Sequence, residues 1–256
     1  MLMTILTDIH LHNLSYTPLV ALQYLISQLL NRAEEFESLV KISIITLQEY
    51  ISNHLPLSKD RIVKLMLQHI DASDHAARLL EVAMHSLAQA MYELDVYIGQ
   101  EVKPLSQMRS ANKKHGNVAD IEILLDGEVV EAWDAKYGKT YLRDEIEELG
   151  DKLQTNTHVE IAGFVTSSQP ERISELQPRL NELQAIYGTR IHIFQFSDWV
   201  STQFSRAYDE MDVNEADLSK SWITAYLESI AQLRREIAPI DEPCYRWLDS
   251  LRLLLT

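Results

Sequence analysis

Three side chains in the middle of the chain could bind a metal ion and cleave a phosphodiester bond. Asp120 lies in one segment of alternating polarity, and Asp134 and Lys136 lie in the next. Two carboxylates suit Mg²⁺, which prefers hard oxygen ligands and usually keeps waters and phosphate oxygens as further ligands. A lysine beside such an ion can orient or deprotonate a water and stabilise the transition state. These residue types predict a Mg²⁺-dependent phosphodiesterase site that also accepts Mn²⁺, with Asp120 and Asp134 as metal ligands.

A β-hairpin is the element that would position these residues. Residues 118–125 and 128–136 alternate between apolar and polar side chains, and Asp126-Gly127 between them is a strong signal for a tight turn. Asp134 and Lys136 share one face of their strand, because successive side chains point to opposite faces. If Asp120 points to the same side across the hairpin, two carboxylates and one ammonium group meet. The alternative is a charged hairpin that only faces solvent.

The segments around the hairpin predict a mixed α/β sheet. Apolar residues at helical spacing precede it, and alternating or apolar strands follow it. The predicted elements are helices over 17–70, a helix over 74–94 with Ser73-Asp74 at its N-cap, a strand over 97–102, the hairpin, a helix over 141–154, a strand over 158–165, a helix over 170–187 that ends at Gly188, a strand over 190–196, an amphipathic helix over 214–238 and a short last helix. This order favours an α+β fold with a mixed central sheet and helical additions at both ends.

The hairpin residues resemble the PD-(D/E)xK nuclease superfamily, which includes many type II restriction endonucleases. Ala119-Asp120 stands where the family often has Pro-Asp, and Asp134-Ala135-Lys136 matches the (D/E)-x-K element. The resemblance covers the order of elements over 74–200. In that family the helix before the first strand often supplies an acid, which implies that Glu81 is a third catalytic carboxylate in the metal region. A solvated helix acid is the alternative for Glu81.

The resemblance implies a restriction-endonuclease-like sheet and a Mg²⁺-dependent DNA endonuclease of the restriction or host-defence kind. Such enzymes often act as homodimers on double-stranded DNA, so a homodimer is expected. The chain then divides into a helical region over 1–73 that could serve recognition or dimerisation, a nuclease core over 74–205, and C-terminal helices over 206–256 that pack on this core. The rival from another class is a DNA-binding module that keeps the fold without catalysis.

A basic loop leads into Asp120 and could hold nucleic-acid phosphates. The predicted contacts are Arg109, Asn112, Lys113, Lys114 and His115, with Lys139 as a further phosphate contact after the hairpin. The alternative is an exposed charged loop. The net charge of −15 does not favour indiscriminate coating of DNA, because phosphate contacts need cations, so a local and specific contact fits this distribution better.

The N-terminus contains a second metal-binding pattern. Asp8, His10 and His12 resemble the Asp-x-His-x-His motif of amidohydrolase barrels, and histidines at that spacing can bind a catalytic metal. A barrel of that kind alternates strand and helix eight times, whereas residues 17–94 offer helices without strands. The amidohydrolase interpretation is therefore the weaker one.

Composition predicts a soluble cytoplasmic protein. The chain has 256 residues, of which 46% are hydrophobic and 24% are charged, as in ordinary globular proteins. A single cysteine, Cys244, excludes an intramolecular disulfide and fits a reducing compartment. The first residues lack the basic region of a signal peptide, and no apolar run is long enough to span a membrane.

Overall fold

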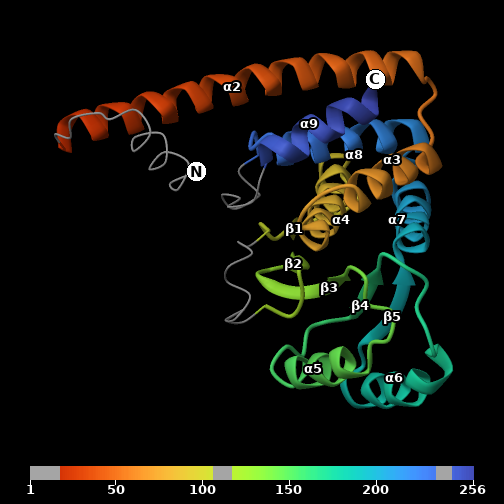
Figure 1. Ribbon diagram of the computed structural model, residues 1–256. Helices are drawn as coiled ribbons and strands as arrows, with labels where there is room; N and C mark the ends of the chain where they lie inside the picture. The colour runs from red at the N-terminus through yellow and green to blue at the C-terminus, as the bar shows by residue number, and fades with distance from the viewer. Residues whose placement is uncertain (1–17, 106–116, 235–243) are drawn as a thin grey trace.

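The computed structural model describes residues 18–105, 117–234 and 244–256. Within these ranges the chain forms eight helices and five strands (Figure 1). The helices are α2 (Pro18–Asn53), α3 (Lys59–Asp71), α4 (Ala76–Glu93), α5 (Arg143–Leu153), α6 (Ile173–Tyr187), α7 (Phe196–Met211), α8 (Glu215–Ile230) and α9 (Cys244–Leu255). The strands are β1 (Gln100–Val102), β2 (Ile121–Leu125), β3 (Glu128–Lys136), β4 (Ile161–Thr166) and β5 (Arg190–Gln195).

The five strands form one mixed sheet in the order β1-β2-β3-β4-β5. β1, β2 and β3 pair antiparallel, whereas β3, β4 and β5 pair parallel. A two-residue turn joins β2 to β3, and the parallel pairs are joined by crossovers through α5 and α6. The predicted α+β class with a mixed central sheet and helices at both ends is confirmed.

Two apolar cores lie on opposite faces of this sheet. One face, which includes Ile121 and Trp133, packs against α4 and α7 in a core that extends through α2, α3, α8 and α9. The other face, which includes Ala132 and Phe164, packs against α5 and α6. Figure 1 shows the resulting layers, with the large helical layer on one side of the sheet and the α5–α6 layer on the other. Neighbouring residues of β3 therefore point into different cores, as strand geometry requires.

The helical layer joins segments from both ends of the chain through a buried polar contact. His69 of α3 lies within hydrogen-bond distance of the Tyr226 hydroxyl on α8, at 2.8 Å, and of the Trp247 carbonyl on α9, at 2.8 Å. Burial lowers the pKa of His69 to about 4, so the ring is neutral at physiological pH. Helices from both ends of the chain therefore share one core with α4.

Several element boundaries differ from the sequence predictions. Residues 18–53 form one continuous helix, and α7 was not predicted at all, so the expected boundary between residues 205 and 206 falls inside a helix. The N-cap of α4 is His75 in the left-handed conformation, without a side-chain cap bond, which corrects the expected Ser73-Asp74 cap. Gly188 ends α6 in the left-handed conformation, as predicted. None of the helices in the described ranges is long and apolar enough to cross a membrane.

Candidate active site

The β2–β3 hairpin has the tight turn that its sequence predicts. Asp126 and Gly127 both have positive φ, at 52° and 84°, which is the conformation of a two-residue type I′ turn. Leu125 pairs with Glu128 directly across this turn. Further along, the register shifts between Ile123 and Leu124, which is the signature of a β-bulge in the facing strand.

The three predicted catalytic residues meet at the open end of this hairpin. The Ala135 backbone N–H donates a hydrogen bond of 3.0 Å to Oδ2 of Asp120. The Lys136 ammonium donates one of 2.6 Å to Oδ2 of Asp134. Asp134 and Lys136 alternate with Trp133 and Ala135, so they lie on the sheet face that α5 and α6 cover. Asp120 lies just before β2, and its carboxylate accepts this hydrogen bond from the backbone of β3.

The environment of Asp134 favours its protonated form. Burial is the largest cause that raises the pKa of Asp134, to about 7, followed by the negative charge of Asp120 and a hydrogen bond shared with it. The nearby Lys136 ammonium acts in the opposite direction and offsets only part of this effect. The protein therefore concentrates negative charge here without fully neutralising it.

This donor set fits a hard divalent cation. Mg²⁺ is commonly held by one or two carboxylates, with waters and substrate phosphates as its other ligands. A bound cation would remove the repulsion between Asp120 and Asp134 that now favours protonation of Asp134. Asp120 and Asp134 are the residues that could hold such an ion, and Lys136 stands beside them.

Glu81, the third predicted metal-region carboxylate, lies on α4. Its carboxylate accepts a hydrogen bond of 2.6 Å from Arg78, whose side chain is almost fully buried. In the described ranges no group of three His, Cys, Asp or Glu side chains is close enough together to hold a metal ion. The structure thus brings Asp120 and Asp134 together and does not add Glu81 to them as a third member of such a group.

Glu122 anchors the segment that leads into Asp120, a role that sequence reasoning missed. The buried Glu122 carboxylate accepts hydrogen bonds from the backbone N–H groups of Val118 and Ala119, and it forms an ion pair with Lys103. The same ammonium donates a bond of 2.8 Å to Oδ1 of Asn117. These contacts hold residues 117–119 against the end of β1. The only sequence signal for this role was a glutamate on the same side of its strand as Asp120.

The residues after Lys136 are tied to neighbouring elements. The Tyr137 hydroxyl donates to Asp71 at the end of α3, at 3.1 Å, and the Gly138 N–H donates to Ser167 Oγ, at 2.9 Å. Lys139, the predicted phosphate contact, forms an ion pair with Glu145 in the first turn of α5. Its side chain is about half exposed, so the pair lies at the surface next to the hairpin.

Two groups of predicted site residues lie outside the described residues. They are the loop residues Arg109, Asn112, Lys113, Lys114 and His115, and the N-terminal residues Asp8, His10 and His12. Their predicted roles in nucleic-acid contact and in an amidohydrolase-like metal site stay predictions.

No protein-family model matches this chain, and no curated protein sequence matches it either.

Proposed function

We propose that the chain is a Mg²⁺-dependent endonuclease that hydrolyses DNA phosphodiester bonds, of the PD-(D/E)xK type and from a restriction or other host-defence system. The observation that carries this proposal is the meeting of Asp120, Asp134 and Lys136 at one end of the β2–β3 hairpin. Two hydrogen bonds hold the carboxylates there: the Ala135 N–H donates to Asp120, and the Lys136 ammonium donates to Asp134. The order of elements from α4 to β4, one helix, three antiparallel strands, a helix and a parallel strand, also supports it.

Each residue of the site has a distinct task in this reaction. Asp120 and Asp134 would hold the cation, which supplies positive charge against the charge that develops on the phosphorus centre. The Ala135 N–H fixes the Asp120 carboxylate, so this ligand does not have to be ordered when the ion binds. Lys136 Nζ can donate a hydrogen bond to the attacking water or to a phosphate oxygen, which orients the one and stabilises the charge on the other.

The test is cleavage of supercoiled plasmid DNA by the purified full chain. Cleavage is expected with Mg²⁺ or Mn²⁺ and not with EDTA. Asp120→Asn and Asp134→Asn should remove it, and Lys136→Ala should reduce the rate by about 100-fold or more, as the loss of a positioned acid–base or charge-stabilising group does. Lys220→Ala is the matched control, because Lys220 is an exposed lysine on α8 and should leave cleavage unchanged.

The same experiment separates catalysis from binding alone. Wild-type protein that binds varied DNA tightly and leaves it intact with Mg²⁺ would identify a non-catalytic DNA-binding module and refute the nuclease proposal. Cleavage that survives both aspartate substitutions would also refute it, because the activity would then come from another site or from a contaminant.

A further inference from the structure

The first half of α2 carries a row of exposed apolar side chains. Leu19, Leu22, Ile26 and Leu29 have exposed fractions of 63%, 52%, 47% and 51%. Figure 1 shows this half of the helix extending past the start of α9, which is the main packing partner of α2. Contiguous apolar surface of this kind marks an interaction site. A helix in water also gains most of its stability from packing such a face.

The exposed row continues without a break into the buried side of the same helix. A single heptad register describes both halves, with apolar or small residues at positions a and d. These positions are Leu19, Leu22, Ile26, Leu29, Ala33, Phe36, Val40, Ser43, Leu47 and Tyr50. They are exposed as far as Ala33, partly buried at Phe36, and buried from Val40 onward. Among the residues that the structure describes, this seam therefore has helical partners along its second half only.

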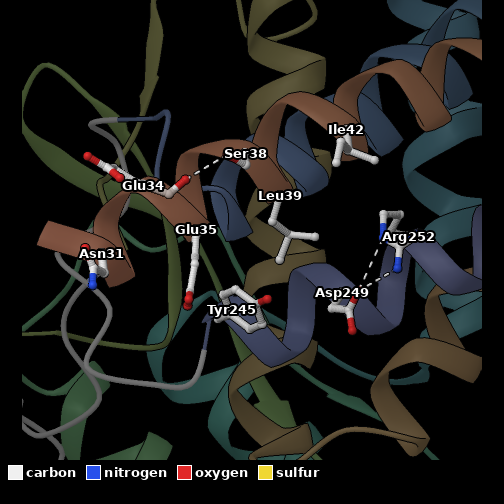
Figure 2. A pocket seen from close by; sticks show the side chains of 9 residues that line it. All are labelled: Asn31, Glu34, Glu35, Ser38, Leu39, Ile42, Tyr245, Asp249 and Arg252. Atoms are coloured by element: carbon white, nitrogen blue, oxygen red, sulfur yellow. Dashed lines mark hydrogen bonds and ion pairs between the residues drawn. The ribbon is translucent and has the colours of Figure 1, made fainter. Parts of the chain in front are cut away.

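Figure 2 shows the part of α2 that lies beside the first turn of α9. Leu39 points from α2 toward α9, and Tyr245 in the first turn of α9 lies near Glu35 and Leu39. α9 begins at Cys244. The part of the seam nearer the N-terminus of α2 therefore extends past the start of α9. The open part of the seam thus starts where an established helix–helix contact stops.

We propose that a second copy of this chain covers the open part, and that residues 19–37 of the two copies form a parallel two-stranded coiled coil. Parallel dimers favour a β-branched residue at a and leucine at d, which matches Ile26 at a between Leu22 and Leu29 at d. Residues 19–31 carry no charge, so the paired segments bring no like charges together.

The flanking charges agree with the parallel orientation. In a parallel pair, a residue at position g faces the e residue of the following heptad on the partner helix. Arg32 stands at g and Glu37 at e, so opposite charges would meet on both sides of the seam. One heptad earlier, Leu25 at g would meet Leu30 at e, which extends the apolar contact. Arg32 now pairs with Glu35 on its own helix in a solvent-exposed contact that can exchange.

The first test is the mass of the full chain in solution by size exclusion with light scattering. The expected value is twice the chain mass of 29.5 kDa. Ile26→Glu should return the protein to the monomer mass, because it places two like charges in the seam. Ser27→Glu adds the same charge to the same helix turn outside positions a and d, and it should leave the dimer intact. A monomeric wild type, or a dimer that survives Ile26→Glu, would overturn the proposal.

The second test reads the orientation. Leu22→Cys should give a disulfide-linked dimer on mild oxidation, because equivalent d positions face each other in a parallel, in-register pair. Ser27→Cys is the control and should not cross-link. The natural Cys244 is buried, which keeps the background low. Dimers that cross-link through residue 27 and not through residue 22 would exclude the proposed pairing. A monomer in which residue 22 resists thiol labelling would mean that the seam is covered by the chain's own N-terminal residues.

Discussion

Asp120 faces Asp134 across the β2–β3 hairpin because β3 contains one residue more than β2 between the turn and the site. Leu124 pairs with Val129, but Ile123 pairs with Glu131, so Val130 has no counterpart in β2. A shift of one residue moves every later side chain to the other face of the sheet. Without this bulge, Asp120 would lie opposite Trp133, whose side chain belongs to the core under α4.

Deletion of Val130 should therefore separate the two carboxylates. The strand on one side of the deletion must slip, so either Asp120 leaves the face of Asp134 or the apolar face of one strand turns outward. We expect loss of Mg²⁺-dependent cleavage together with a lower free energy of unfolding. Val130→Ala shortens the same half-buried side chain without changing the register, and it should keep cleavage near the wild-type rate. Wild-type cleavage by the deletion variant would show that the bulge does not align the site.

The hairpin itself was predictable from sequence, whereas the bulge was not. Asp126-Gly127 and the alternating segments on both sides are local signals, and they predicted β3 with its exact bounds. A tight two-residue turn without a bulge would have placed Asp120 and Asp134 on opposite faces. Local sequence therefore did not predict that Asp120 and Asp134 share a face of the sheet, because nothing local distinguishes Val130 from an ordinary strand residue.

The metal-free protein should lose stability as the pH rises toward neutrality. Burial and the charge of Asp120 raise the pKa of Asp134 to about 7, above its value of about 3.9 in an unfolded chain. The folded state thus holds this proton more tightly, so the contribution is complete below about pH 4 and is lost as the pH rises through about 7. The loss from this group is a few kcal/mol, at most about 4.

Urea unfolding in EDTA at pH 5 and at pH 8 measures this effect. Asp134→Asn should reduce the difference in free energy of unfolding between the two pH values. Asp151→Asn, at an exposed position on α5, should leave this difference unchanged. At 100 times its dissociation constant, Mg²⁺ should raise the free energy of unfolding of the wild type at pH 8 by about 2.7 kcal/mol. The same pH dependence in wild type and Asp134→Asn would contradict the assignment.

Gly163 of β4 should not tolerate a side chain. A Cβ at this position would lie 2.6 Å from the Trp133 ring and in contact with the His192 carbonyl oxygen. Gly163 pairs with Trp133 in the parallel ladder, so the ring lies over a strand that has no side chain there. Gly163→Ala is expected to cost about 1–3 kcal/mol, as overpacking of a core usually does.

The matched control is a second glycine-to-alanine change. Gly150→Ala in α5 would meet one Leu183 methyl group at 3.0 Å and otherwise make ordinary contacts at 3.7 Å, and alanine favours a helix over glycine by about 1 kcal/mol. Urea unfolding followed by tryptophan fluorescence should therefore show a clear loss for Gly163→Ala and a smaller or opposite change for Gly150→Ala. Equal stability of the two variants would mean that Trp133 does not pack tightly on β4.

The missed elements have different physical reasons. α7 has a helical signal, because Trp199, Phe204 and Ala207 are buried on one side of it, but Phe196 follows β5 without any turn residue to mark the change. The Glu122–Lys103 pair joins β2 to the residue that follows β1, and sequence spacing does not reveal which lysine a buried glutamate will meet. Local patterns therefore predicted the types of most elements, whereas contacts between residues far apart in the sequence depend on the three-dimensional fold.

Glu122 and Lys103 should act as one unit that positions Asp120. Glu122→Gln removes the charge from a buried acceptor of two backbone N–H groups and should cost about 1–3 kcal/mol. Lys103→Met leaves the buried carboxylate without its cation, and because Lys103 is about one-third exposed we expect about 2–3 kcal/mol, below the range for fully buried pairs. The double variant should be more stable than the sum of the two single losses predicts, by about 1 kcal/mol or more.

If Glu122 positions Asp120, Glu122→Gln should also change the Mg²⁺ dependence of cleavage. The Mg²⁺ concentration for half-maximal cleavage should rise by about 10-fold, because a partner that orients a metal ligand is lost. The rate at saturating Mg²⁺ should fall less than in Asp120→Asn. Additive stabilities with an unchanged Mg²⁺ requirement would show that the pair does not act as a unit and does not position Asp120.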